Sequence, residues 1–421
     1  PGPVLIDIPK DIQTQSGPAT YPDHVDIRGY KPNETVHIGQ LKKAYKMLKS
    51  AKQPLLLAGG GVNISGAQEL LTTFAEKMRV PVVTTVMGKG AIPTDHPLYV
   101  GNSGMHGRYA ANMAVSECDV LFSVGTRFND RITGDLNEFA PKAKIVHLDI
   151  DAASISRNVV VDVPVVSDAK IALEHLVEWA EPKNTDKWLT KISTWQEENP
   201  LEMRRDHGLS PQMIMETINE TFPQGIVVTD VGQHQMWATQ YITMPRGKQM
   251  ITSGGLGTMG FGFPAAIGAK IGAPNQDVVC ITGDGGMQMN MQEMATAICE
   301  KVPLTVCILN NYYLGMVRQM QQLFYGKRYE ITCLRRQVGC PDGCKGPNAA
   351  CPPYVPDFVK WAESYGAHGI RVHSAEEARE ALAKAKEHKD APTVIEFMIA
   401  TDELVLPMVK SGNPMSEMIL K

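Results

Sequence analysis

Short apolar segments alternate with longer helical patterns through most of this chain, and this alternation is the feature that most restricts its fold. In the first half, we expect strands at 54–58, 81–86, 119–124 and 144–150. In the second half, the corresponding runs lie at 225–230, 277–282, 302–309 and 393–398. Strands separated by helices favour parallel sheets with helices on their faces. The sequence therefore predicts an α/β protein with two parallel-sheet domains in tandem, at 37–180 and 209–400.

Helical spacing and capping signals mark several of the intervening segments. Apolar side chains recur at helical intervals at Ile38, Leu41, Ala44, Tyr45 and Leu48. Ser65 followed by Gln68 has the pattern of a capping box, and 374–388 reads as a capped, charged surface helix. Helical patterns are also expected at about 263–272 and 288–300. Residues 14–36 and 181–208 are expected to be linkers, and 401–421 a C-terminal tail.

The first residues form an apolar stretch without a basic segment of the signal-peptide kind. Val4, Leu5 and Ile6 are typical of a strand, which needs a neighbouring strand to satisfy its backbone. We therefore expect residues 1–13 to be the last strand of a further domain that precedes Pro1.

Charge and cysteine content exclude some classes of partner. The 41 basic and 45 acidic residues give a net charge of −4, so we expect neither nucleic acid nor an anionic membrane surface as a partner. No apolar run approaches the ~20 residues that a membrane span needs. Eight cysteines in 421 residues are too few for a disulfide scaffold, which favours the cytoplasm.

The strongest chemical signal is Gly-Asp-Gly at 283–285 followed by Asn-Asn at 310–311. Each motif follows an apolar strand, so both lie at the carboxyl edge of a parallel sheet, where such sheets bind ligands. Mg²⁺ prefers oxygen ligands and often bridges phosphates. Asp284 offers a carboxylate, Asn311 an amide oxygen and Tyr313 a backbone carbonyl. Glycines at 283, 285 and 286 allow a diphosphate to approach the backbone.

Other interpretations of the glycine motifs are weaker. Gly-Asp-Gly alone would be an ordinary turn, and it is the pairing with Asn-Asn on strand ends that favours a metal site. Residues 255–260 match G-x-G-x-x-G, which in dinucleotide-binding proteins follows a buried strand. The preceding residues, 250–255, are a poor strand, and this disfavours a dinucleotide site.

Together with VGQHQMW at 231–237 and GGLGTMGFGFPAAIG at 254–268, the motif resembles the acetolactate synthase (acetohydroxyacid synthase) large-subunit family. The likeness extends to GTRFNDRITG at 125–134, HLDIDAASISRN at 147–158, NNYYLGMVRQ at 310–319 and LPMV at 406–409. Members of this family have a thiamine-pyrimidine domain, a central FAD domain and a diphosphate domain. The resemblance covers the last two domains, and it implies that the activating Glu lies in the first domain, before Pro1.

The resemblance implies a site for thiamine diphosphate and Mg²⁺ in the second domain. Gln233 and His234 would reach the diphosphate, and Met259 would hold the cofactor bent, although an isolated Met is usually core filler. The metal ligands would be Asp284, Asn311 and Tyr313. The other cofactor-binding residues implied are Gly232, Gly257, Gly283, Gly285, Gly286, Leu314, Gly315 and Met316.

The resemblance also implies an FAD site in the central domain. The Gly59-Gly60-Gly61 run follows a strand and could cradle a phosphate, or be a bare turn. His106 could equally be an ordinary loop histidine, and Asp149 and Asp151 alternate at a strand end, so only one would face the ligand. The residues implied are Gly59, Gly60, Gly61, Thr85, Met87, Met105, His106, Gly107, Gly125, Arg127, Asp130, Asp149, Ile150 and Asp151.

Two residues are expected to choose and hold the second substrate. By resemblance, Arg131 would hold the carboxylate of the second 2-oxoacid, for which a guanidinium is well suited. The alternative is a surface salt bridge with Asp130 or Asp135. Met320 stands where the family usually has Trp, which puts the preference for 2-oxobutyrate over pyruvate in doubt.

The implied function is a transferase reaction in branched-chain amino-acid biosynthesis. Pyruvate is decarboxylated and joined to a second pyruvate or 2-oxobutyrate, giving 2-acetolactate in the first case, and FAD would be structural. The resemblance implies a homodimer or tetramer through the cofactor domains, with a regulatory small subunit. Alternatives are another flavin-type carboligase, a pyruvate oxidase, or a non-enzymatic assembly subunit.

The segment 333–351 departs from the family, whose chain runs more directly between its flanks. Cys333, Cys340, Cys344 and Cys351 have the symmetric spacing C-x₆-C-x₃-C-x₆-C. Four thiolates can close a Zn²⁺ or Fe–S site, and we expect such a site here. Disulfides and four free thiols are the alternatives.

Overall fold

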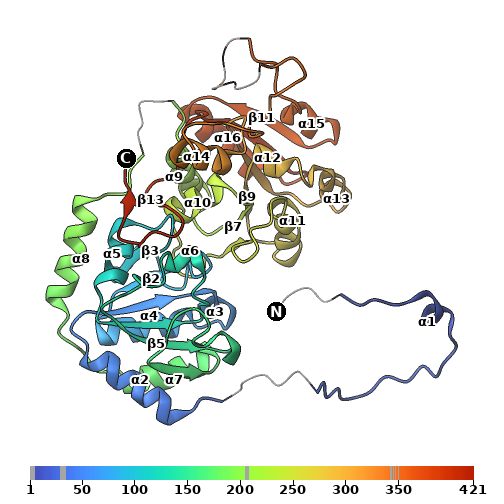
Figure 1. The fold of residues 1–421 in the computed structure, drawn as a ribbon. Coiled ribbons are helices and arrows are strands. Elements are labelled where there is room, and N and C mark those ends of the chain that lie inside the picture. Colours follow the sequence, from blue (N-terminus) through green and yellow to red (C-terminus); the bar gives the residue numbers. More distant parts are fainter. Residues whose placement is uncertain are drawn as a thin grey trace.

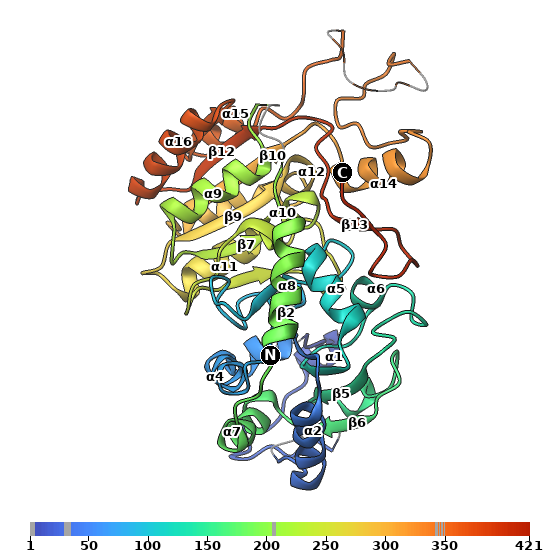
Figure 2. The same ribbon diagram turned by 90° about the vertical axis from the view of Figure 1, so that its left-hand side faces the viewer.

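The structure, a computed structural model, describes residues 5–28, 35–203, 208–341, 344, 346, 348 and 350–421. Two six-stranded sheets with helices on both faces form two stacked units, with helix α8 (Asp186–Glu198) running along the side between them (Figures 1 and 2). Every strand pair within the two sheets is parallel. The predicted α/β fold class is therefore confirmed.

The first sheet has the order β3-β2-β1-β4-β5-β6. Its strands are β1 (Pro54–Ala58), β2 (Val82–Thr84), β3 (Tyr99–Asn102), β4 (Val120–Val124), β5 (Lys144–Asp149) and β6 (Val163–Val166). One face packs against helices α2 (Ile38–Ser50), α4 (Gln68–Met78) and α7 (Ala169–Trp179). The other face packs against α5 (Tyr109–Glu117) and α8. Because β1 and β4 are central, their residues are buried throughout, as continuous apolar runs require.

The second sheet has the order β11-β12-β10-β9-β7-β8. Its strands are β7 (Ile226–Thr229), β8 (Met250–Thr252), β9 (Val278–Gly283), β10 (Thr305–Asn310), β11 (His368–Val372) and β12 (Thr393–Met398). Helices α9 (Pro211–Thr221), α10 (Gln233–Tyr241) and α16 (Ala375–Glu387) cover one face. Helices α11 (Gly262–Gly272), α13 (Met294–Cys299) and α15 (Phe358–Ser364) cover the other.

The remaining elements are short and lie in the connecting segments, in the N-terminal arm and in the C-terminal tail. They are α1 (Lys10–Thr14), α3 (Gly60–Ile64), α6 (Asp130–Thr133), η1 (Ala152–Ser154), α12 (Asp284–Met287), η2 (Met291–Glu293), α14 (Gly315–Phe324), β13 (Met408–Val409) and β14 (Met418–Ile419). The C-terminal tail crosses from the second unit to the first, where Val409 N donates to Met105 O at 2.8 Å. None of the helices in these described ranges combines the length and the apolarity of a membrane span.

Several local predictions are wrong. Ser65 does not cap α4: it follows α3 and its hydroxyl bonds to Val62 O, while α4 begins at Gln68 with no side-chain cap. Gly66, at φ +66°, turns the chain between the two helices, so the capping-box spacing is coincidental. The expected helix at 288–300 is divided into η2 and α13. Asp151 lies beyond the end of β5, so it does not alternate with Asp149 on a strand.

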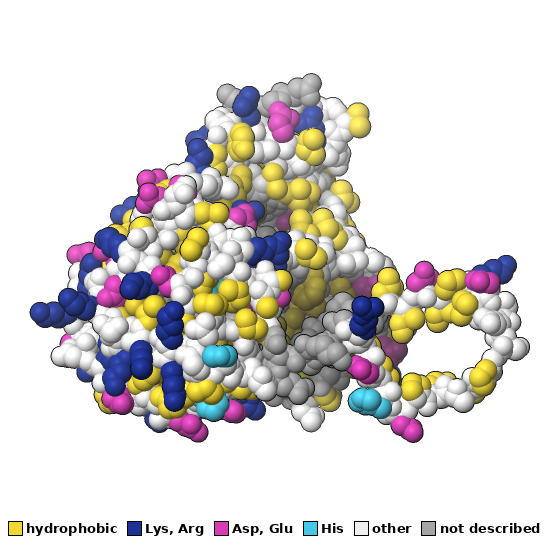
Figure 3. Space-filling view, turned by 60° about the horizontal axis from the view of Figure 1, so that its bottom comes forward, with side chains coloured by type: hydrophobic (Ala, Val, Ile, Leu, Met, Phe, Trp, Pro, Cys, Tyr) yellow, Lys and Arg dark blue, Asp and Glu magenta, His cyan; other side chains and the backbone are white. Residues whose placement is uncertain are grey.

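The N-terminal arm, residues 5–28, stands away from the rest of the chain (Figures 1 and 3). Leu5 and Ile6 are 94% and 76% exposed and belong to no strand, while Val4 lies outside the described residues. The expected strand is therefore absent from the described part of this arm, because no neighbouring strand pairs with its backbone.

Candidate functional site

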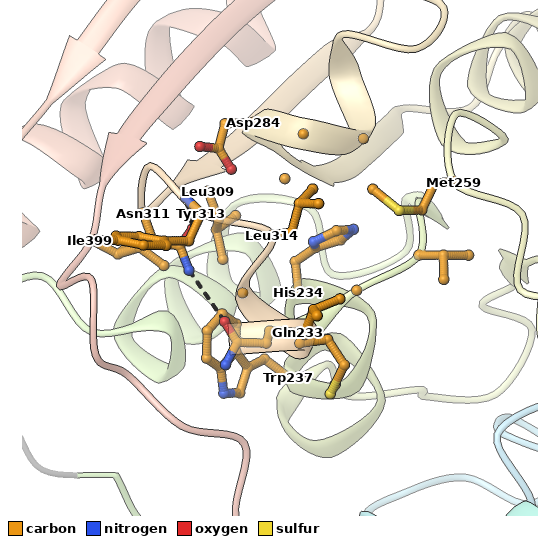
Figure 4. Close-up of a pocket in the computed structure, with 18 residues that line it drawn as sticks. Gln233, His234, Trp237, Met259, Asp284, Leu309, Asn311, Tyr313, Leu314 and Ile399 are labelled. Atoms are coloured by element: carbon orange, nitrogen blue, oxygen red, sulfur yellow. Dashed lines mark hydrogen bonds between the residues drawn. The ribbon is translucent and has the colours of Figure 1, made fainter. Parts of the chain in front are cut away.

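The carboxyl ends of β7, β9 and β10 surround a pocket of about 470 Å³ in the second unit (Figure 4). The pocket is lined by these residues that the sequence predicted: Gly232, Gln233, His234, Met259, Gly283, Asp284, Gly285, Gly286, Asn311, Tyr313, Leu314, Gly315 and Met316. Gly257, Arg131 and Met320 are not part of its lining. Trp237, to which the sequence analysis gave no role, is part of the lining.

Asp284 is the buried carboxylate of this pocket. It is the first residue of α12 and only 2% exposed, and its Oδ2 has no hydrogen-bond partner among the described residues. Burial raises the pKa of the Asp284 carboxyl to about 8. An unpaired buried carboxylate is costly unless a cation joins it, so the residues present fit a metal ion.

The other candidate ligands lie opposite Asp284, in the loop after β10. Asn311 Nδ2 donates to Gln233 Oε1 at 3.2 Å, and Asn311 Oδ1 accepts from Tyr313 N at 3.0 Å (Figure 4). These two bonds fix which way the amide points. The described residues gather no three His, Cys, Asp or Glu side chains for a metal. A cation here would therefore depend on amide, carbonyl and ligand oxygens beside the one carboxylate, as Mg²⁺ commonly does.

Gln233 is held by three hydrogen bonds within the protein, and its contact with a diphosphate stays a prediction. Its Nε2 donates to Gln319 Oε1 and to Glu403 O, both at 2.9 Å, and its Oε1 accepts from Asn311. Both amide hydrogens are therefore used within the protein. A side chain at Gly315 would lie 2.0 Å from Gln233 Oε1, so this glycine is required for the contact.

His234 lies between two glycines of the pocket. A Cβ at Gly232 or at Gly283 would lie 2.9 Å from its ring, so neither position has room for a side chain. Burial lowers the pKa of His234 to about 4, which keeps the ring neutral. Its Nε2 is buried without a partner in the described ranges, and the ring points into the pocket (Figure 4). It is therefore available to a polar ligand.

Asp230, which sequence reasoning missed, fixes the glycine-rich loop that carries Met259. Its carboxylate accepts from Gly260 N at 3.1 Å and from Gly262 N at 2.8 Å. The available signal was an acid directly after the apolar strand β7. Met259 lies on the pocket wall beside Gly285, whose added Cβ would be 3.8 Å from its methyl carbon.

Two cations of the first unit bind the C-terminal end of α10, whose N-terminal end carries Gln233. Lys89 Nζ donates to Thr239 O, and an Arg108 terminal nitrogen donates to Gln240 O at 3.1 Å. Lys89 is 4% exposed, and burial lowers its pKa well below the ordinary value. Cations are favourable at this end of a helix. The first unit thus stabilises the helix that lines the pocket.

In the first unit, the predicted glycines bring two strand ends into direct backbone contact. A Cβ at Gly59 would lie 2.1 Å from Gly125 O, and one at Gly61 would lie 2.7 Å from Gly125 Cα. Gly125 has φ +63°, which also favours glycine there. A Cβ at Gly60 would lie 3.0 Å from Met87, and one at Gly107 would lie 2.7 Å from Asn112 Oδ1. Gly59, Gly61 and Gly125 are therefore required by packing, whatever they bind.

Some other predicted residues of this unit face the second unit. A Cβ at Gly254 would lie 2.5 Å from Met87 Sδ, and one at Gly255 would lie 3.9 Å from an Arg127 nitrogen. Thr85 is buried and its hydroxyl accepts from Gly88 N at 3.0 Å. The loop that leads to Met259 therefore lies against Met87 and near Arg127 of the first unit.

The two aspartates predicted near β5 have local partners. Asp149 is buried and accepts from Asp151 N at 2.9 Å. Asp151 accepts from Ala153 N and from the Ser154 hydroxyl, and it caps η1. Ile150, between them, is 49% exposed.

Arg131 and His106 lie together under the C-terminal tail. The Arg131 side chain is 59% exposed, and its Nε lies 3.9 Å from Asp130 Oδ2, a distance at which an exposed pair contributes little. Its Nη1 is 3.7 Å from Met105 Sδ. Burial lowers the pKa of His106 to about 4, and the charge of Arg131 acts in the same direction. The contact with Asp130 is weak, so it leaves the Arg131 guanidinium able to bind a carboxylate.

The four cysteines of segment 333–351 do not form the predicted metal site. All eight cysteines are free thiols, and no group of described His, Cys, Asp or Glu residues is placed to hold a metal ion. Three thiols bond instead to the backbone of their own turns: Cys340 Sγ accepts from Gln337 N, Cys344 Sγ donates to Gly346 O, and Cys351 Sγ accepts from Asn348 N. The prediction of a Zn²⁺ or Fe–S site is wrong for the described residues.

Comparison with known proteins identifies the family. The model described as "Thiamine pyrophosphate enzyme, central domain" matches residues 41–176, and "Thiamine pyrophosphate enzyme, C-terminal TPP binding domain" matches residues 230–397. The acetolactate synthase large subunit of Corynebacterium glutamicum is 43% identical, over 99% of this chain and 66% of its own length. A probable acetolactate synthase large subunit of Methanocaldococcus jannaschii is 44% identical, over 100% of this chain and 70% of its own length. The acetolactate synthase large subunit of Haemophilus influenzae is 40% identical, over 100% of this chain and 72% of its own length.

This chain thus spans about two thirds of the length of these relatives. The likeness runs through both sheets and includes the pocket at the ends of β7, β9 and β10. The chain belongs to the acetolactate synthase large-subunit family of thiamine pyrophosphate enzymes.

Proposed function

We propose that this chain carries the cofactor sites of an acetolactate synthase of branched-chain amino-acid biosynthesis. The enzyme would decarboxylate pyruvate and join the remaining two carbons to a second 2-oxoacid, pyruvate or 2-oxobutyrate. The observation that supports this most directly is Asp284, a buried carboxylate with an unpaired oxygen at a glycine-lined sheet edge. The names of the relatives supply the reaction.

In this proposal, Asp284, Asn311 and the Tyr313 carbonyl would hold the Mg²⁺ needed to bind the diphosphate of thiamine diphosphate. Bound thiamine diphosphate would supply the carbon that adds to the keto group and accepts the electrons released with CO₂. Gln233 orients the Asn311 amide, and His234 offers its unpartnered Nε2 to a phosphate oxygen. Met259, on the pocket wall, would hold the cofactor in a bent conformation.

Arg131 would bind the carboxylate of the second 2-oxoacid, and Met320 would border its side chain. A guanidinium holds a carboxylate through two parallel hydrogen bonds, which fixes the direction of the keto group. Arg131 is mostly exposed and pairs only weakly with Asp130, so it has little to give up when it binds a substrate.

The remaining parts of the proposal rest on the family. FAD would lie in the first unit near Met87, His106 and Arg127, as a structural cofactor. The protein would act in the cytoplasm as a homodimer or tetramer with a regulatory small subunit, since the relatives are named large subunits.

Product analysis tests the proposed reaction. The complete protein, incubated with pyruvate, Mg²⁺ and thiamine diphosphate, is expected to form 2-acetolactate and CO₂, and Asp284→Ala is expected to form neither. Acetate or acetyl phosphate would indicate a pyruvate oxidase, and tartronate semialdehyde formed from glyoxylate would indicate a different carboligase. Either result without acetolactate overturns the proposal.

A further inference from the structure

The side chain of Gln319, on helix α14, is fully buried against the C-terminal tail. Its amide pairs twice with the backbone of one tail residue: Val405 N donates to Gln319 Oε1 at 2.8 Å, and Gln319 Nε2 donates to Val405 O at 3.0 Å. Nε2 also donates to the sulfur of Met408 at 3.1 Å. Since Val405 is fully buried as well, water cannot readily replace this pairing.

Gln319 is also joined to the pocket residue Gln233. The oxygen that accepts from Val405 N accepts a second hydrogen bond, from Gln233 Nε2 at 2.9 Å. Gln233 donates its other hydrogen to Glu403 O at 2.9 Å, and its Oε1 accepts from Asn311 Nδ2 at 3.2 Å (Figure 4). A continuous chain of three side-chain amides therefore runs from the tail to the candidate metal ligand Asn311.

The direction of this amide chain is fixed at the tail, because a backbone N–H can only donate. Val405 N requires the oxygen of Gln319 on its side. That oxygen also takes a hydrogen from Gln233, so Gln233 presents its nitrogen to Gln319 and its oxygen to Asn311. Asn311 then presents its nitrogen, and its oxygen lies on the other side, where it accepts from Tyr313 N at 3.0 Å. A reversed amide would place two nitrogens or two oxygens against each other in a buried site, which is unfavourable.

We propose that Gln319 is a positioning residue for Asn311, through which the backbone of the C-terminal tail sets the orientation of the metal-ligand amide. Gln319 is not part of the pocket lining, so it acts through Gln233. Residues that hold the ligands of a metal commonly set its affinity. This inference rests on the proposed metal–diphosphate site, and it gives the tail a role in metal binding.

A double-mutant cycle tests whether Gln319 acts through Gln233. Calorimetric titration of the complete protein with Mg²⁺, at saturating thiamine diphosphate, measures the metal affinity. Gln319→Met keeps the length of the side chain and removes the oxygen that accepts from Gln233. The variant Gln233→Met and the double variant complete the cycle, which measures the dependence of one residue on the other.

Gln240→Met is the matched control. Gln240 is also buried and donates to the same tail, at Leu406 O (3.1 Å), and to His106 O (3.2 Å). Its own oxygen has no partner in the described ranges. Gln240 therefore holds the tail without joining the amide chain, and replacing it separates a loosened tail from a lost amide orientation.

We expect Gln319→Met to bind Mg²⁺ about 10-fold more weakly than the unchanged protein. The double variant should bind no more weakly than Gln233→Met alone, because Gln319 has no other route to the metal ligand. Gln240→Met should bind like the unchanged protein. If Gln319→Met does not fold, Gln319→Asn takes its place in the cycle, since the shorter side chain withdraws the amide from Gln233.

Several results would overturn this role of Gln319. An unchanged affinity of Gln319→Met, with or without a lower melting temperature, would leave Gln319 as support for the fold. Losses that multiply in the double variant would show that it acts independently of Gln233. An equal loss in Gln240→Met would assign the effect to the loosened tail.

Asp284→Asn separates the failure of this inference from that of the proposed metal site. If Asp284→Asn loses Mg²⁺ while Gln319→Met binds it normally, only the role of Gln319 is refuted. If Asp284→Asn binds Mg²⁺ as tightly as the unchanged protein, the proposed metal site fails, and the inference fails with it.

Discussion

The side-chain amides of Asn311 and Gln233 face each other across the pocket, with Asn311 Nδ2 donating to Gln233 Oε1 at 3.2 Å. The two residues come from different elements, the loop after β10 and the first turn of α10. Since one hydrogen bond fixes the orientation of both amides, Asn311 presents its oxygen on the side of Tyr313 N. The loop that carries the candidate metal ligands and the first turn of α10 are therefore held in one network.

Replacing Gln233 with Met should weaken Mg²⁺ binding without reaching the metal directly. The thioether keeps the volume but cannot accept from Asn311, whose amide is then free to turn its nitrogen towards the cation. Losing such an orienting partner costs about 10-fold or more in metal affinity. Calorimetric titration with Mg²⁺ at saturating thiamine diphosphate measures this, and an unchanged affinity would show that Asn311 needs no partner.

Replacing Arg131 with Ala should slow carboligation more than decarboxylation. A lost charge-assisted hydrogen bond costs ~1.5–3 kcal/mol, and each ~1.4 kcal/mol is a factor of ten in rate. Acetolactate formation in the complete protein should therefore fall ~10–150-fold, while CO₂ release from the first pyruvate changes little. Equal losses in both steps, or no loss, would show that Arg131 does not hold the second substrate and only contacts Asp130.

Replacing Met320 with Trp should raise the preference for 2-oxobutyrate as the second substrate. Met320 is half-buried on α14, and a rigid, flat side chain would give a longer aliphatic group more surface to contact. The ratio of the two acetohydroxyacid products, formed from an equal mixture of the oxoacids, measures this preference. If the product ratio of Met320→Trp equals that of the unchanged protein, Met320 lies outside the substrate pocket.

His106 should make the fold sensitive to mild acid. Burial lowers the pKa of His106 in the folded chain to about 4, whereas an exposed histidine titrates near 6.5. The unfolded chain therefore takes up the proton first, so the stability is present above pH ~6.5 and is lost as the pH falls towards 4. Between pH 7 and pH 5 this one group should cost about 2 kcal/mol.

The variant His106→Gln isolates that contribution. Guanidinium unfolding of both proteins at pH 7 and pH 5 should show a smaller loss of stability in the variant, because it lacks the titrating ring. If both proteins lose the same stability, His106 is not neutral and buried as the structure has it.

The central elements of the fold could be predicted from sequence because their signals are local. β12 forms at the predicted residues 393–398, and Ser374 caps α16 as expected, accepting from Glu377 N. The edge strands were harder to predict from the sequence. β3, β6 and β11, which were not predicted, and β8, which looked too weak, are the outer strands of the two sheets. β6, β8 and β11 are only partly buried, so their apolar patterns are faint. β3 is buried, but it has four residues and two of them are Gly and Asn, which are rare in strands.

The pocket could be predicted from sequence where its residues follow strands in recognisable motifs, as Asp284 and Asn311 do. The contacts that hold these residues in place could not be predicted from the sequence. Lys89 reaches the end of α10 from the first unit, and Asp230 holds the loop that carries Met259. Such pairings depend on how the units pack, and no local pattern encodes them.

The binding of thiamine diphosphate to Asp284→Ala tests the central claim most directly. Trp237 lines the pocket, so its fluorescence can report binding in titrations with Mg²⁺ or with chelator. We predict that the unchanged chain binds the cofactor only with Mg²⁺ and that Asp284→Ala does not bind it. Because the variant loses an unpaired buried carboxylate, it should melt no lower than the unchanged chain. Binding within twofold of the unchanged chain, with the same dependence on Mg²⁺, would contradict the account.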